Sequence, residues 1–193
     1  TITKLTVGGT LSNGTVDLYK LKVTANTADV DVYKFAFDIT TTTVNLSDVE
    51  LLDITEDTEE SLYSQSTSAW TSVSGASFIN VLLDDDNPTA GVGGELRTIS
   101  KGTPRTYVLR GTVTGASSGD SISTRMGGDG GPAGEAVTTI MNTANLIDTD
   151  PYQDFIWSDR SVASHATTTA DWTNGYLVSG LNSASSTPSV VAL

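Results

Sequence analysis

The stretches Val16–Val23 (VDLYKLKV) and Val30–Phe37 (VDVYKFAF) repeat one phrase on either side of the six-residue link TANTAD. Both alternate apolar and polar residues with a period of two, which is typical of a β-strand that buries one face. In the first copy the apolar face carries Tyr19, Leu21 and Val23, and two lysines point the other way. The repeat therefore predicts two strands of one design, with aromatic and aliphatic side chains inward and lysines outward.

The second copy can be placed beside the first in two ways. Its apolar face would carry Tyr33, Phe35, Phe37 and Ile39. In a hairpin, a register with Lys20 directly opposite Lys34 is unfavourable, because like charges repel across a ladder, whereas a shift by two residues separates them. If the link instead arches over, the strands belong to opposite sheets and their apolar faces meet. We favour the arch, because it lets both apolar faces bury each other.

Further strand patterns follow along the chain, separated by turn residues such as Gly, Asn and Pro. The segments are Val49–Ile54, Ser61–Gln65, Ser77–Leu83, Gly94–Ser100, Arg105–Gly115 and Ser121–Met126. Strands this frequent, with no sustained helical periodicity, predict an all-β protein, namely a β-sandwich of the immunoglobulin-like or jelly-roll type. We expect residues 10–193 to form this single domain, with long loops at Met126–Ala136 and Ser161–Gly175.

The charge of the chain limits its partners. The 193 residues carry a net charge of −13, and the ten basic residues are scattered. Nucleic-acid binding needs clustered Lys and Arg, so we expect no nucleic-acid partner. No apolar run approaches the roughly 20 residues that span a bilayer, so no membrane insertion is expected. The acidic surface favours solubility in a salty or extracellular setting. The absence of cysteine excludes disulfides and thiolate chemistry.

Both ends of the chain carry short apolar segments with high strand propensity. Residues 1–9 present Ile2, Leu5 and Val7 and end in a Gly-Gly pair. The tail presents Val190, Val191 and Leu193. Either segment would serve as a donor strand that completes the sheet of a neighbouring copy. We favour residues 1–9 as the donor, because the glycines supply a hinge.

The sequence offers no credible catalytic centre, and we expect no enzyme. Gly115–Gly119 (GASSG) matches G-x-S-x-G, but it lies between two predicted strands with no helix after it, unlike a nucleophile elbow. His165 is the only histidine, with Asp159, Ser164 and Asp171 nearby in sequence. Triads are made by spatial geometry, so this proximity does not indicate one.

Oxygen-rich acidic clusters suggest calcium as the one possible cofactor. Ca²⁺ takes six to eight oxygen ligands, and neither cluster is an EF-hand. The ligands would be Asp84, Asp85 and Asp86 in one loop, and Asp148, Asp150 and Asp154 in another.

Aromatic and asparagine residues suggest contacts with sugars. Asn13 and Asn45 begin N-glycosylation sequons in settings typical of loops. A platform for surface or host glycans would use aromatic residues from Trp70, Tyr152, Trp157, Trp172 and Tyr176. Packing in the core or at an interface is the competing interpretation of these aromatic residues. An isopeptide bond from Lys20, Lys22 or Lys34 needs a buried lysine, and the alternation points all three outward.

Two segments, residues 16–54 and residues 154–181, resemble predicted secreted surface proteins of uncultured, small-genome bacteria. Those proteins look like Ser/Thr-rich β-sandwich modules with a C-terminal signature, F-I-W-S-D-x-S … S-H … D-W-T-N-G-Y. Here it falls on Phe155–Trp157, Asp159, Ser164, His165 and Asp171–Tyr176. The resemblance implies an exported surface module. It also implies that Trp157, His165 and Trp172 belong to a packed structural corner.

These observations favour a non-enzymatic structural subunit of an extracellular filament or surface layer. Head-to-tail donation of a strand does not close on itself, so copies of the chain would form a homopolymer. The alternative hypothesis is a cell-surface carbohydrate-binding or adhesion module that uses the aromatic residues and the long loops.

Overall fold

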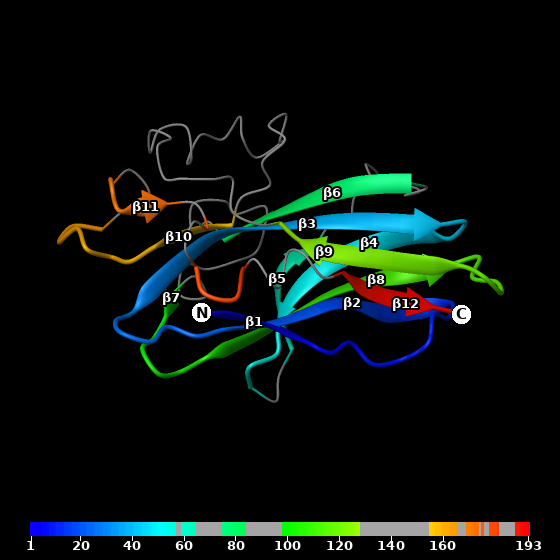
Figure 1. Ribbon diagram of the computed structural model, residues 1–193, viewed down its shortest axis with the longest axis horizontal. Coiled ribbons are helices and arrows are strands. Elements are labelled where there is room, and N and C mark those ends of the chain that lie inside the picture. The colour runs from blue at the N-terminus through cyan, green and yellow to red at the C-terminus, as the bar shows by residue number, and fades with distance from the viewer. Residues whose placement is uncertain are drawn as a thin grey trace.

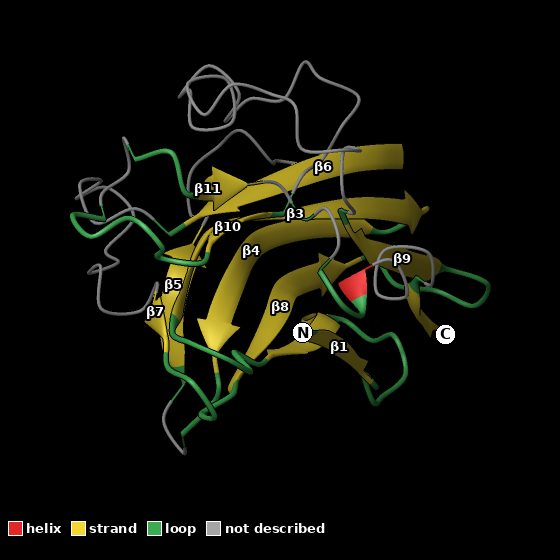
Figure 2. Cartoon of the chain, turned by 60° about the vertical axis from the view of Figure 1, so that its left-hand side comes forward, coloured by secondary structure: helices red, strands yellow, loops and turns green. Residues whose placement is uncertain are grey.

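The computed structural model describes residues 1–56, 59–64, 75–83, 98–127, 155–165, 169–173, 175, 178–181 and 188–193. Over these residues the chain is an all-β protein, in which two antiparallel sheets pack against each other (Figure 1). The sequence-based prediction of a β-sandwich is confirmed. Figure 2 shows that the strands lie side by side and that the two layers are curved.

The first sheet contains five strands in the order β1-β2-β8-β4-β5. Their bounds are β1 Ile2–Leu5, β2 Gly14–Val23, β8 Arg105–Thr114, β4 Asn45–Asp53 and β5 Glu60–Ser64. Strand β8 lies at the centre and pairs with β2 and β4 over most of its length. Strands β1 and β5 form the two edges of this sheet.

The second sheet is built around the long strand β3, Val30–Thr42. Its partners are β6 Gly75–Leu82, β7 Thr98–Ile99, β9 Ser121–Met126 and β10 Ile156–Ser158. Two further strands extend it: β12 Ser189–Ala192 pairs with β9, and β11 Trp172–Thr173 pairs with β10.

The link between the two repeated phrases arches from one sheet to the other, as we expected from the sequence. Strand β2 belongs to the first sheet and β3 to the second. Their apolar faces meet in the core, where the rings of Tyr19 and Phe37 lie 5.7 Å apart and those of Phe35 and Tyr107 lie 5.2 Å apart. All four side chains are 0% exposed.

Each copy of the phrase contains a β-bulge that the alternation did not reveal. In β2 the extra residue is Leu18, so both it and Tyr19 reach the core. In β3 the extra residue is Tyr33 opposite β10. The prediction that Tyr33 shares a face with Phe35 is therefore wrong, because the bulge turns Val32 into the core and lets Tyr33 pack edge-on against Trp172.

Two other local predictions need correction. Lys34 was expected to face solvent but is only 4% exposed, because β3 is a central strand and the residue is flanked by Leu82 and Ile156. Strands β10 and β11 were missed, and β11 falls inside a segment predicted as loop. They contain three and two residues, which is too short for a period-two pattern to register.

We expect Phe35→Ala to destabilise the protein by about 3–5 kcal/mol, because the ring fills the centre of the core against three other aromatic rings. Urea denaturation measures the free energy of unfolding. The matched control is Val162→Ala at an exposed position, which should change that free energy by less than about 0.5 kcal/mol. Equal effects of the two substitutions would contradict this account of the core.

Candidate functional site

Both terminal strands lie on the same side of the sandwich, one at the edge of each sheet. Strand β1 borders the first sheet and β12 the second. They approach closely: Lys4 Nζ donates a hydrogen bond to the carbonyl oxygen of Pro188 at 2.7 Å. A groove of about 370 Å³ runs between them, lined by residues 4–7 and 188–190. The two segments that the sequence singled out as donor strands are thus neighbours in space.

Strand β1 is seated within its own chain. It pairs antiparallel with the last four residues of β2, from Ile2 opposite Val23 to Leu5 opposite Lys20. Backbone hydrogen bonds of 2.9 Å join Thr1 and Thr24 in both directions. The Ile2 side chain is 2% exposed and belongs to the core.

On the side away from β2, strand β1 contacts residues 179 and 180. The Ile2 amide donates to the carbonyl oxygen of Ser179 at 2.8 Å. A Cβ atom on Gly180 would lie 1.9 Å from the Ile2 carbonyl oxygen, and the φ of Gly180 is +86°. Only glycine allows the two backbones to approach this closely. We call the site that receives β1, formed by Val23, Thr24, Ser179 and Gly180, the β1 slot.

The linker between β1 and β2 is exposed apart from one anchor. Residues 6, 8–10, 12 and 13 are exposed and Val7 is half-buried, whereas Leu11 is 0% exposed and its amide donates to the Ala192 carbonyl oxygen at 3.1 Å. Gly9 adopts a φ of +110°, and nothing lies within 4 Å of the position of an added Cβ. Five linker residues therefore separate β1 from its first buried anchor.

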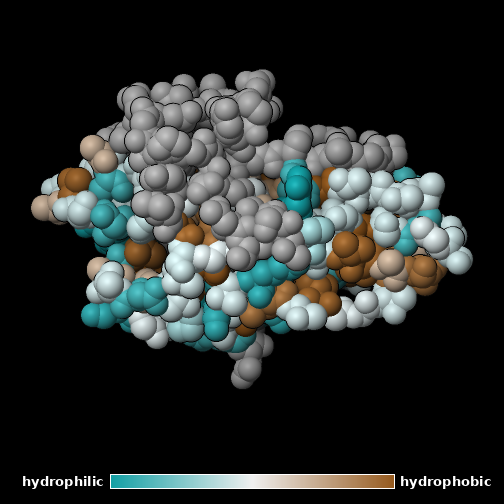
Figure 3. Space-filling model, viewed as in Figure 1, coloured by the Kyte–Doolittle hydropathy of each residue, from teal (hydrophilic) through white to brown (hydrophobic). Residues whose placement is uncertain are grey.

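The six residues predicted to form a polymer interface divide into three groups. Ile2 and Val191 are buried in the core of their own chain. Leu5 and Val7 are half-buried. Val190 and Leu193 are 60% and 49% exposed, and apolar side chains gather along this part of the surface near β12 (Figure 3).

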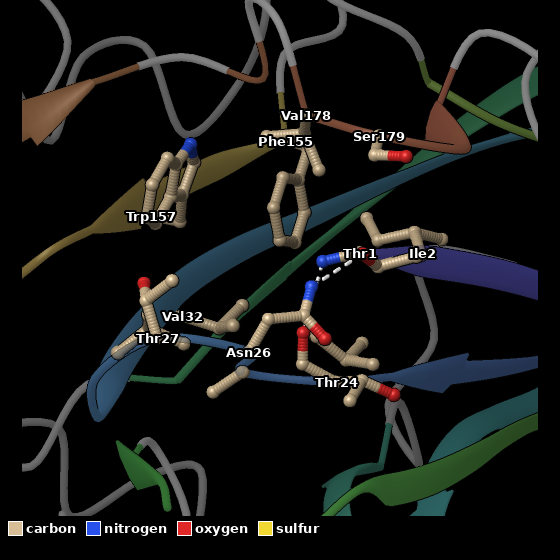
Figure 4. A pocket seen from close by; sticks show the side chains of 13 residues that line it. Thr1, Ile2, Thr24, Asn26, Thr27, Val32, Phe155, Trp157, Val178 and Ser179 are labelled. Atoms are coloured by element: carbon tan, nitrogen blue, oxygen red, sulfur yellow. Dashed lines mark hydrogen bonds between the residues drawn. The ribbon is translucent and has the colours of Figure 1, made fainter. Parts of the chain in front are cut away.

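A cavity of about 250 Å³ opens beside the buried end of β1. Ile2 stands on one side of it and Trp157 on the other, with Phe155 above and Asn26 and Val32 below (Figure 4). The walls are mostly aliphatic and aromatic. No local sequence pattern indicates this cavity, since its walls come from five separate segments of the chain.

His165 is held on the outer face of the second sheet, at the start of β3. Its Nδ1 lies 2.8 Å from Asp171 Oδ2, and its Nε2 lies 3.0 Å from Asp31 Oδ2. Trp172 packs against the ring at 4.9 Å between centroids. The packed corner implied by the resemblance therefore contains His165 and Trp172, whereas Trp157 lies on the inner face, at the cavity.

No serine contacts the histidine among the described residues. Both ring nitrogens face carboxylates, and the hydroxyl group near the ring is that of Thr169, whose Oγ1 lies 3.4 Å from Nδ1. Ser164 is exposed, and the Asp159 carboxylate accepts from the Ser161 amide. The GASSG segment forms the turn between β8 and β9, where Asp120 accepts hydrogen bonds from the amide and hydroxyl of Ser117.

Several candidate site residues lie outside the described part of the chain. These are Asp84, Asp85, Asp86, Asp148, Asp150 and Asp154 for calcium, and Trp70, Tyr152 and Tyr176 for sugars. Within the described ranges, no group of three acidic or histidine side chains is placed to hold a metal ion. Asn13 and Asn45 are both exposed, near the end of β8 where Gly14 pairs with Val113 and Asn45 with Thr114.

Comparison with known proteins adds no relative. The chain matches no protein-family model, no curated protein and no solved structure. In the part of the chain that the structure describes, no helix has the length and apolar character needed to cross a bilayer. The arguments about function below therefore rest on the geometry of the molecule.

We expect Gly180→Ala to displace β1 from the β1 slot. Gly102→Ala is the matched control, because Gly102 also has a positive φ, +76°, but nothing lies within 4 Å of the position of an added Cβ. The control should cost about 1–2 kcal/mol for the left-handed conformation alone. Gly180→Ala should cost more and should also increase hydrogen exchange in residues 1–5. Equal losses of stability and unchanged exchange would contradict the close approach.

Proposed function

We propose that the protein is a structural subunit of an extracellular filament or surface layer, in which neighbouring copies exchange strand β1. The observation that carries the proposal is the seating of β1. It is an edge strand, connected through an exposed linker, whose slot is formed by segments distant in the sequence. Extracellular location, the homopolymer and the absence of catalysis all belong to this proposal.

Exchange would conserve the contacts that β1 makes within its own chain. A β1 strand from a second copy would form the same hydrogen bonds to β2 and Ser179 and bury the same Ile2 side chain. The free energy of the closed monomer and of the exchanged form then differ mainly in the linker and in association entropy. Domain swapping is a low-cost route to assembly for this reason, and head-to-tail exchange gives open polymers.

The linker sets how far a neighbour can lie. If Leu11 stays anchored, residues 6–10 span at most about 18 Å when fully extended. This length allows β1 to leave its own slot and enter one on an adjacent copy. The short reach favours neighbours in direct contact, as in a filament or layer, over subunits that are loosely tethered.

The proposal is tested with engineered cysteines, since the natural chain has none. Thr3 and Lys22 are directly opposite in the β1–β2 register, a spacing that a disulfide spans. We expect the oxidised double variant Thr3→Cys/Lys22→Cys to remain monomeric in sedimentation velocity at concentrations where the reduced form assembles. A monomer at every concentration, with or without the disulfide, would contradict the proposal.

A second arm of this experiment detects the exchange directly. Mixing the single variants Thr3→Cys and Lys22→Cys should produce disulfide-linked dimers only if β1 of one chain pairs with β2 of another. The matched control mixes Ser12→Cys with Lys22→Cys, because Ser12 is exposed and follows the Leu11 anchor. Cross-linking of both mixtures to the same extent would indicate random collision.

A binding module for surface or host glycans is the second candidate. The observation that favours it is the cavity, where the Trp157 ring is accompanied by the Asn26 amide and the hydroxyl groups of Thr24 and Thr27. Sugars pack their apolar faces on aromatic rings and offer hydroxyl groups to such polar neighbours. On a glycan array, wild-type protein should bind and Trp157→Ala should lose at least tenfold in signal. Wild-type protein that binds no glycan would exclude this function.

A further inference from the structure

Between β10 and β11, the described residues 159–165 and 169–171 form an arm at one end of the long axis of the molecule (Figure 1). Most of its described residues are exposed, including Val162 at 37%. The arm contacts the sheet through His165 and, at its first turn, through Arg160, whose Nη1 lies 3.3 Å from Asp31 Oδ1 and 3.1 Å from the Thr98 hydroxyl oxygen. The inference below concerns the His165 contact and does not depend on the exchange of β1.

The histidine bridges two carboxylates that are removed from solvent. The side chains of Asp31 and Asp171 are 4% and 0% exposed, and that of His165 is 9% exposed. Asp31 belongs to β3, whereas Asp171 and His165 belong to the arm. The contact from Nε2 to Asp31 is therefore the one by which the ring fastens the arm to the sheet.

Other groups stabilise the carboxylates without replacing the histidine. Asp31 Oδ1 accepts from the Thr98 hydroxyl at 2.7 Å and lies 3.3 Å from Arg160 Nη1. Asp171 accepts from the Thr169 hydroxyl and from the Val162 amide. Among the described residues, Asp31 and Asp171 are the carboxylates within hydrogen-bond distance of the ring, and Arg160 brings a positive charge to Asp31.

When Asp31 and Asp171 are both ionised, the two contacts of the ring are both hydrogen bonds only if each ring nitrogen carries a proton. A neutral imidazole has a single N–H group, so it donates to one carboxylate and turns a lone pair toward the other. At 2.8 and 3.0 Å, that second contact would be repulsive. The imidazolium ion donates to both.

We propose that His165 is a pH-dependent clasp, which in its protonated form holds the arm on the second sheet and on deprotonation releases it. A group that gains partners when protonated stabilises the folded arrangement below its titration and loses this contribution as the pH rises through it. Histidine is the residue whose ordinary titration lies between pH 5 and 8. The clasp therefore acts while both ring nitrogens carry protons and is lost when one of the protons leaves.

The clasp also has an acid limit. Burial would raise the pKa of Asp171, but hydrogen bonds from Thr169, Val162 and His165 outweigh it and lower the pKa to about 2. A carboxyl group whose pKa is lowered on folding stabilises the folded state above its ordinary value of 3.8 and loses this contribution as the pH falls toward 2. We expect the arm to be held most firmly between these two limits.

The protonation state can be read directly, because His165 is the only histidine in the chain. Nitrogen-15 chemical shifts of the imidazole ring in the wild-type protein distinguish a doubly protonated ring from either neutral tautomer. We expect both nitrogens to carry protons at pH 6 and one of them to lose its proton by pH 9. A neutral ring at pH 6 would overturn the proposal, and this measurement needs no variant.

Hydrogen exchange monitored by mass spectrometry tests the release of the arm. After correction for the intrinsic effect of pH, protection of residues 159–171 should fall at least tenfold between pH 6 and pH 9, while β2 and β8 remain unchanged. In His165→Gln the arm should be unprotected at both pH values. Val162→Ala, a change on the same arm away from the ring, should behave as wild type. Equal protection of the wild-type arm at both pH values would overturn the clasp.

Discussion

The meeting of the two apolar faces of β2 and β3 is the contact on which the rest of the structure depends. It places the repeated phrases in opposite sheets, so that Tyr19 faces Phe37 across the core. Every other strand in the described part of the chain then extends one of these two sheets. Because the link between the phrases arches at one end, the cavity and the β1 slot both form there, where Ala25 and Asn26 line the cavity wall.

The phrase repeats an aspartate as well as its apolar residues, and the structure gives both aspartates a similar place. Both copies contain an aspartate before the bulge, and both aspartates receive an arginine from a later segment. Asp17 lies 2.7 Å from Arg110, and Asp31 lies 3.3 Å from Arg160. The repeat thus encodes a strand with an apolar inner face and an acidic outer position. In the first sheet this position meets a neighbouring strand, and in the second it meets the arm.

The sequence predicted the sandwich, the arch and the positions of the longer strands, because period-two alternation is a local property. It did not predict the bulge at Tyr33, since an extra residue leaves no mark on the pattern before the partner strand is known. One partner of His165, Asp171, lies near it in the sequence, whereas the other, Asp31, could not be predicted. Asp31 lies 134 residues away from His165 in the chain. Asp159 and Ser164 are much nearer in the sequence but do not contact the ring. Long-range contacts of this kind arise only from the packing of the two sheets.

The approach of Gly180 to Ile2 has a consequence for the order in which the molecule is completed. Strand β1 rests against Ser179 and Gly180, which a ribosome adds long after it, so β1 cannot occupy its slot until those residues have been synthesised. During that interval β1 has not yet bound and the β1 slot is not yet filled. Neighbouring nascent chains would then compete to place their β1 strands in each other's slots. Whether β1 binds its own chain or another would depend on the local concentration of chains as well as on equilibrium stability.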